Sequence, residues 1–66
     1  MDKPDWSEAP EDAMFWSPET KDFNESWYKQ QDDCWFCVNV DSFNVFGSPW
    51  YGIGRQMLRD DLESRP

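Results

Sequence analysis

The 66-residue chain contains no histidine, and it has only two cysteines, Cys34 and Cys37. Without an imidazole, the usual general base of Ser-His-Asp and Cys-His catalysis is missing, and so is the commonest side-chain ligand for metals. A structural zinc site needs four ligands, normally Cys or His, and two cysteines do not supply them. We therefore predict that the chain is not an enzyme, and that it has no catalytic residues, no metal and no cofactor.

Long hydrophobic runs are also missing. The longest, residues 34–38 (CWFCV), is far shorter than the ~20 apolar residues of a membrane-spanning helix. Residues 1–5 (MDKPD) lack the basic segment followed by an apolar stretch that marks a secretion signal. These absences favour a soluble protein of a reducing cytoplasm that does not contact membranes.

Basic residues are scarce, and the charge is unevenly distributed. Six Lys and Arg face fourteen Asp and Glu, which gives a net charge of -8. Residues 1–33 hold ten acids and three lysines, residues 34–54 hold Asp41 alone, and residues 55–66 are balanced. Such a negative chain repels nucleic acid and anionic membranes, and it attracts basic protein surfaces.

Aromatic residues, by contrast, are plentiful: five Trp, five Phe and two Tyr. Disordered acidic chains are poor in aromatics, so this composition predicts a folded chain. We expect a single small domain over residues 1–66, with residues 1–12 as a candidate extended arm. A domain of about 60 residues buries only ~60% of its unfolded surface, and a homodimer, which the sequence leaves open, would add core.

The sequence predicts an α+β fold, with a small antiparallel β-sheet of three to four short strands and one short C-terminal helix. Aromatic and β-branched residues that alternate in and out favour strands, whereas the i, i+4 spacing of Leu58 and Leu62 favours a helix. For residues 18–30 the pattern allows either a helix or a strand. The strands are predicted at residues 26–30, 34–40 and 43–46, with a further candidate at 13–16, and the helix at 55–62.

The Cys34-x-x-Cys37 pair could be a redox motif or half of a zinc site. A redox pair needs a cation or a helix N-terminus to lower the thiol pKa, yet no basic residue occurs between Lys29 and Arg55. We interpret both cysteines as small hydrophobic residues, and we expect free thiols that need no metal.

Several short motifs resemble a loose group of small acidic accessory proteins of tailed bacteriophages and prophages. They are the opening DWSEAPEDA of residues 5–13, the pair Trp27-Tyr28, the following Trp35, and the closing Arg65-Pro66. The chain departs from the pattern where such proteins often carry a histidine in the first strand, because Met14 or Phe15 stands there. The resemblance implies a phage accessory protein and assigns no catalytic residue.

Charge and aromatic content together predict a binding protein. We expect it to occupy a basic, nucleic-acid-binding surface of a host protein, such as a restriction, CRISPR or transcription factor, and to inhibit that protein without binding nucleic acid itself. Alternatively, exposed aromatics serve self-association in a structural or assembly protein, and the acids confer only solubility. Five Trp exceed what a small domain can bury, and exposed Trp is a common binding anchor. The expected contacts with the partner are Asp5, Trp6, Glu8, Glu11, Asp12, Glu19, Asp22, Trp50 and Tyr51.

Overall fold

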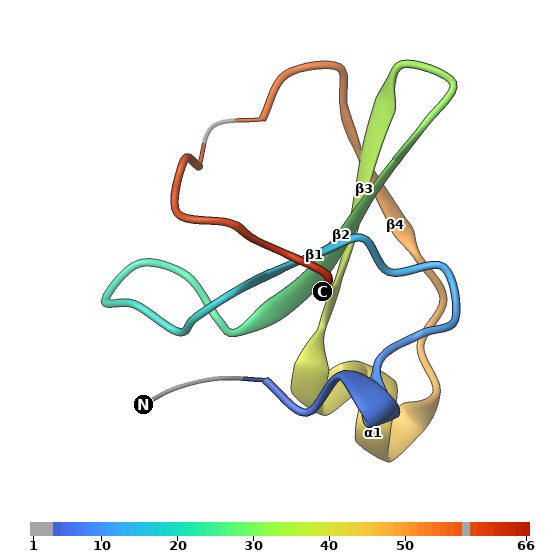
Figure 1. Cartoon of the computed structure of the whole chain (residues 1–66), viewed down its shortest axis with the longest axis vertical. Coiled ribbons are helices and arrows are strands. Elements are labelled where there is room, and N and C mark those ends of the chain that lie inside the picture. Colours follow the sequence, from blue (N-terminus) through green and yellow to red (C-terminus); the bar gives the residue numbers. More distant parts are fainter. Residues whose placement is uncertain (1–3, 58) are drawn as a thin grey trace.

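The computed structural model describes residues 4–57 and 59–66. Within them the strands form one antiparallel five-stranded sheet in the order β4-β3-β2-β1-β5 (Figure 1). The α+β class is therefore confirmed, with more strands than the three to four expected. In chain order the elements are η1 (Trp6–Glu8, a 3-10 helix), β1 (Phe15–Ser17), β2 (Ser26–Gln31), β3 (Cys34–Asn39), α1 (Val40–Phe46), β4 (Tyr51–Gly54) and β5 (Glu63–Ser64).

The β2–β3 hairpin is the longest pairing of the sheet. Six residues of each strand are in register, from Ser26 opposite Asn39 to Gln31 opposite Cys34. Asp32 and Asp33 close the hairpin with φ angles of 55° and 63°, as a two-residue turn of the primed type requires, and Asp tolerates this conformation. The strand reading of residues 26–30 is confirmed, and the helix considered for residues 18–30 is wrong.

The strand predicted at residues 43–46 is wrong, because β3 ends at Asn39 and α1 begins at the next residue. Val40 and Phe43, three positions apart, both pack against the core, as one face of a helix allows. Gly47 ends α1 in the left-handed conformation, and its N–H donates to the Phe43 carbonyl at 2.9 Å. Alternation along residues 34–46 concealed this change from period 2 to a helical period.

The helix predicted at residues 55–62 is also wrong: residues 55–57 and 59–62 are extended or irregular, and residue 58 lies outside the described residues. Topology explains the error. The segment runs from β4 at one edge of the sheet to β5 at the other, about four strand spacings or ~19 Å. Eight helical residues rise only ~12 Å, whereas an extended chain of that length reaches ~26 Å.

The core lies on one face of the sheet. Trp16 of β1, Trp27 of β2 and Val38 of β3 are cross-strand neighbours, and they are buried together with Ala13. The partly buried side chains that cover this cluster come from η1 and its neighbours, from α1 and from the segment before β4: Trp6, Ala9, Val40, Phe43 and Trp50. The N-terminal segment thus packs against the core from Trp6 onward; residues 1–3 of the candidate arm are outside the described residues.

The left-handed end of α1 provides a test of the fold. A Cβ at Gly47 meets no atom within 4 Å, but its φ of 62° is unfavourable for an L-residue, at a cost of roughly 1–2 kcal/mol. We expect Gly47→Ala to lower the free energy of unfolding by about that amount in urea denaturation followed by Trp fluorescence. Gly52→Ala is the control, because its Cβ lies at an ordinary 3.5 Å from the Phe36 ring. Equal effects of the two variants would contradict this account of the helix end.

Candidate functional site

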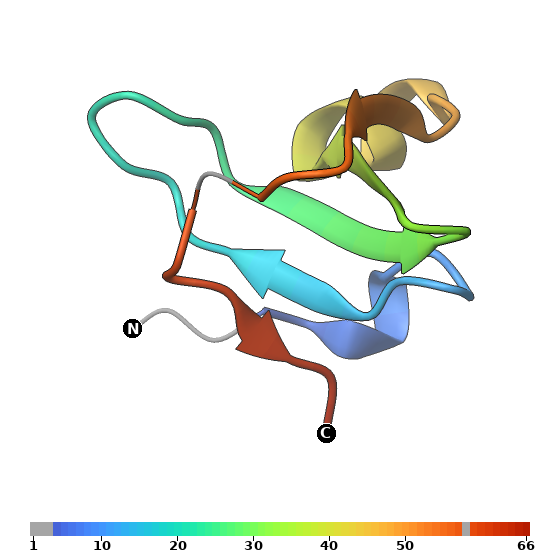
Figure 2. The ribbon, with the colours of Figure 1, turned by 90° about the horizontal axis from the view of Figure 1, so that it is seen from above.

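The six acids predicted to contact a partner do not gather on one face. Asp5 caps η1, where its Oδ1 accepts from the Ser7 N–H at 3.1 Å, and Glu8 lies within η1. Glu19 and Asp22 stand in the β1–β2 loop. In both views this loop lies on the opposite side of the molecule from the chain around Glu11 and Asp12 (Figures 1 and 2).

The two tryptophans expected at the surface are instead half-buried. Trp6 packs on Trp27 with ring centroids 5.0 Å apart, and the Trp50 Nε1 donates to Asp12 Oδ1 at 3.0 Å. Both were predicted to be exposed, and that prediction is wrong because these two rings pack within the fold, where large rings bury the most apolar surface. Tyr51, by contrast, is exposed.

Three of the basic side chains make contacts within the fold; those of Lys29 and Arg59 are nearly buried, whereas Arg65 is exposed. Lys29 Nζ, with its side chain 12% exposed, contacts Asp12 Oδ2 at 2.8 Å. Arg65 Nη1 donates to the carbonyls of residues 10, 11 and 13 at 2.9–3.3 Å, and its guanidinium lies 5.4 Å from the Trp6 ring centroid. The third is Arg59. Among the described residues every Asp and Glu except the half-buried Glu25 is exposed, so the surface is more negative than composition alone indicates.

Arg59 fastens the C-terminal segment to the sheet. Its side chain is only 6% exposed and pairs with Asp61. Nη1 donates to Ser17 Oγ at 3.0 Å and Nη2 to the Pro18 carbonyl at 3.2 Å, while the guanidinium lies 4.7 Å from the Phe23 ring centroid. The bond to Asp61 raises the pKa of Arg59 and lowers that of Asp61. Sequence reasoning missed this role because three of its partners, Ser17, Pro18 and Phe23, are 36 to 42 positions away.

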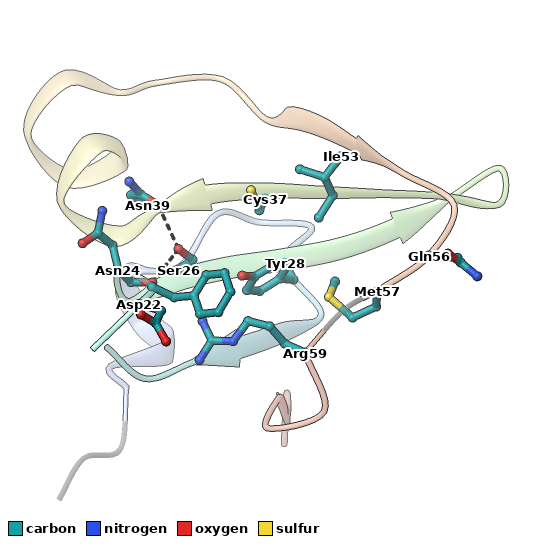
Figure 3. Close-up of a pocket in the computed structure, with 11 residues that line it drawn as sticks. Asp22, Asn24, Ser26, Tyr28, Cys37, Asn39, Ile53, Gln56, Met57 and Arg59 are labelled. Carbon is teal, nitrogen blue, oxygen red and sulfur yellow. Dashed lines mark hydrogen bonds between the residues drawn. The ribbon is translucent and has the colours of Figure 1, made fainter. Parts of the chain in front are cut away.

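A cavity of about 380 Å³ opens on the face of the sheet opposite the core; we call it the open-face pocket (Figure 3). Tyr28 of β2 and Cys37 of β3 are cross-strand neighbours at its floor. Figure 3 shows the polar side chains of Asp22, Asn24 and Asn39 gathered at one end. The full lining is Asp22, Phe23, Asn24, Ser26, Tyr28, Cys37, Asn39, Ile53, Gln56, Met57 and Arg59.

A second, polar cavity of about 270 Å³ adjoins the open-face pocket, and the two share Asn24 and Asn39. We call it the acidic groove. Its other lining residues are Glu19, Glu25, Asp41 and Ser42. The carboxylate of Glu25 is oriented by the core, because the Trp16 Nε1 donates to its Oε2 at 2.8 Å.

Of the three acids in the groove, the sequence predicted only Glu19 as a contact. Glu25 immediately precedes β2 and Asp41 stands in the first turn of α1. Their meeting depends on β3 ending beside the start of β2, where the Val40 N–H donates to the Glu25 carbonyl at 3.0 Å. One feature of the sequence could have predicted that they line the same groove. Glu25 precedes the first strand of the hairpin and Asp41 follows the second, so both lie at the same end of the hairpin.

The two thiols cannot act together within one chain. Cys34 and Cys37 lie three residues apart on β3, so their side chains point to opposite faces of the sheet. Both are free cysteines. Burial raises the pKa of Cys37, which keeps this thiol protonated and unreactive at neutral pH. Among the described residues no group of three or more Cys, Asp or Glu side chains is arranged to hold a metal ion.

No protein-family model matches the chain, and no curated protein or solved structure is significantly similar to it. In the described part of the chain, no helix is long and apolar enough to cross a membrane. A proposal for its function therefore depends on the charges, exposures and contacts of its own residues.

The clamp formed by Arg59 can be tested by truncation. A buried hydrogen bond to a charged group contributes about 1.5–3 kcal/mol, and we expect Arg59→Ala to lower the free energy of unfolding by at least that range. Arg55→Ala removes the same charge from an exposed position and should change stability by less than ~0.5 kcal/mol. Urea denaturation of both variants gives the comparison. If they are equally stable, Arg59 does not fasten the segment.

The ion pair of Asp12 predicts a dependence on pH. The hydrogen bond from Lys29 is the main cause that lowers the pKa of Asp12 below its ordinary 3.8. Because the folded pKa is the lower one, the pair stabilises the fold fully above the unfolded pKa, and this contribution is lost as pH falls through the folded pKa. Asp12→Asn should therefore be less stable than the parent at pH 6, and the difference should shrink towards pH 2.5. Urea midpoints at both pH values measure it, and a constant difference would contradict the assignment.

Proposed function

We propose that the chain is a non-enzymatic acidic binding protein that occupies a basic, nucleic-acid-binding surface of another protein and so inhibits it. The observation that carries this proposal is the segregation of charge: the side chains of Lys29 and Arg59 are nearly buried, while every described acid except the half-buried Glu25 is exposed. The exposed surface is therefore more negative than the net charge of the chain indicates, and such a surface attracts a basic partner.

The charge density also supports this proposal. The molecule measures 28 × 24 × 23 Å and carries a net charge of -8. Over its long axis this is about one charge per 3.5 Å, close to the ~3.4 Å between phosphates of a single nucleic-acid strand. Because the acids surround the molecule, a basic groove meets the part of this charge that faces it.

The expected setting is a phage-infected bacterial cell. The motifs in residues 5–13 and around Trp27 and Trp35 resemble small acidic phage accessory proteins, so a host restriction, CRISPR or transcription factor is the kind of target we propose. Because the acids surround the molecule, they steer a basic partner from many directions, and this raises the association rate more than it slows dissociation.

A second candidate function is self-association in an assembly. Val45 and Phe46 of α1 and Tyr51 and Ile53 of β4 are exposed, with Phe46 at 80%. Residues 42–54 carry no charge, and β4 is an edge strand with unpaired backbone groups. Two copies with this net charge could approach along such a neutral stretch.

Binding to a partner captured from bacterial lysate at low salt tests the primary proposal. Glu8, Glu11 and Asp22 are exposed, and reversing all three to Lys changes the net charge from -8 to -2. We expect association to slow at least tenfold, and binding of the parent to weaken steeply as the Debye length falls from ~10 Å at 0.1 M salt to ~3 Å at 1 M. Surface plasmon resonance gives both quantities.

The matched control replaces the same three acids with Gln, which should slow association by an intermediate amount. Self-association, in contrast, should persist at high salt and be lost in a Val45→Ser, Phe46→Ser variant, as sedimentation would report. An association rate and a salt dependence that charge reversal leaves unchanged would mean that the acids serve solubility alone.

A further inference from the structure

We infer that the acidic groove and the open-face pocket form one docking site, in which a partner protein places a Lys or Arg side chain in the groove and a neighbouring apolar side chain in the pocket. This inference rests on the proposed function, because it names the surface through which an acidic binding protein would hold a basic partner. It is carried by the way the two cavities join at Asn24 and Asn39.

The groove lacks a counter-cation of its own. Elsewhere the fold supplies one, since Asp12 pairs with Lys29 and Asp61 with Arg59. Around the groove, by contrast, no Lys or Arg is among the described residues of the lining. The negative charge of the three acids that line this cavity is therefore not neutralised within the lining, and a partner's ammonium or guanidinium group would neutralise it. Those carboxylates belong to Glu19, Glu25 and Asp41.

Two residues of the groove, Glu25 and Asn39, are held in place before any partner arrives. The Glu25 side chain accepts from the buried Trp16 indole at 2.8 Å, and the Glu25 carbonyl accepts from the Val40 N–H at 3.0 Å. Asn39 Oδ1 accepts from the Ser26 hydroxyl at 2.9 Å, a bond drawn in Figure 3. Side chains already ordered in the free protein lose less entropy on binding.

The open-face pocket supplies the apolar half of the site. Its volume of about 380 Å³ is within the ~300–1,000 Å³ of ligand pockets, and it exceeds the volume of a single Leu or Phe side chain. Phe23 and Ile53 are exposed on its walls. Arg59, whose donors already bind Ser17, Pro18 and Asp61, is a fixed wall and not a free cation that would repel a basic partner.

The chemistry of the occupant follows from this pairing. A nucleic acid is repelled by the carboxylates, and a small polyamine would fill the groove and leave the pocket empty. An extended protein segment places alternate side chains about 6.6 Å apart on one side, so an Arg-x-Leu sequence presents a cation and an apolar group to adjoining cavities. The inference commits to such a segment.

Two indole signals of the protein itself report where a ligand binds. The Trp16 indole N–H is bonded to Glu25 in the groove, whereas the Trp50 indole N–H is bonded to Asp12 at 3.0 Å, outside it. We propose an NMR titration of the 15N-labelled full chain with a capped peptide that repeats Arg-Gly-Leu-Gly. This peptide presents the Arg-x-Leu spacing and is called the Leu peptide. The Trp16 indole signal and the amides of Tyr28 and Ile53 should shift, and the Trp50 indole signal should stay unchanged.

Two further ligands separate the halves of the site. A peptide with Ser in place of Leu should bind roughly tenfold more weakly, because burial of a Leu side chain is lost. Spermidine should bind more weakly still, and it should not shift the amide signals of Tyr28 and Ile53 in the pocket. If spermidine binds as tightly as the Leu peptide and shifts the same signals, the groove is a simple cation site and the docking inference is wrong.

Charge-matched variants separate the failure of this inference from failure of the proposed function. Replacing Glu19 and Glu25 with Gln and Asp41 with Asn removes three charges from the groove, and we expect at least a tenfold loss of affinity for the Leu peptide. The control replaces Glu8 and Glu11 with Gln and Asp33 with Asn. It removes three charges elsewhere and should lose less than threefold.

Equal losses in both variants, or a shift of the Trp50 signal in place of Trp16, would support the proposed function and overturn the docking site. No binding of either basic peptide to the parent at low salt would overturn both. If the triple groove variant fails to fold, Asp41→Asn alone replaces it, because this position is exposed and the change leaves the Trp16–Glu25 bond intact. The single variant should bind the Leu peptide about threefold more weakly. An unchanged affinity would overturn the docking site.

Discussion

The packing of Trp27 is the contact on which the rest of the structure depends. It lies at the centre of the sheet, opposite Trp16 on one side and Val38 on the other, with the Trp6 ring 5.0 Å above it. A chain of 66 residues has few other ways to bury enough apolar surface, and each large ring can bury ~150–250 Å². Its indole N–H has no partner among the described residues, a cost of about 1–3 kcal/mol that the surrounding apolar contacts must exceed.

Concentrating the core on one face leaves the other face to the C-terminal segment. That segment must span the sheet from β4 to β5, so it cannot be helical, and a single buried arginine fastens it over Ser17 and Phe23. A chain in extended form covers a sheet incompletely, and the open-face pocket is the space that remains. The candidate docking site is thus a consequence of how little material this chain has for a second layer.

Charge and fold are linked through the basic residues. Lys29 and Arg59 pair with carboxylates and have nearly buried side chains, so these contacts stabilise the fold and also withdraw positive charge from the surface. Four acids also have structural contacts: Asp12 and Asp61 pair with these cations, Asp5 caps η1, and Glu25 accepts from the Trp16 indole. A strongly negative exterior therefore arises from the same interactions that hold the ends of the chain to the sheet, and it is this exterior that a basic partner would meet.

By itself the sequence determined the strand at residues 34–39 and the sign of the surface, because period-2 alternation is a local pattern. For residues 26–30 the sequence allowed a helix as well, and the structure pairs them with β3 as a strand. Only the tertiary structure decided the rest. Val40 to Phe46 is helical because its apolar residues meet the core three apart, whereas residues 55–57 and 59–62 are not helical because the segment must cross the sheet. Trp6 and Trp50 are half-buried because a small core draws in distant rings. Glu25 and Asp41 meet because two strand ends lie side by side, and contacts between residues far apart in sequence leave no local pattern to read.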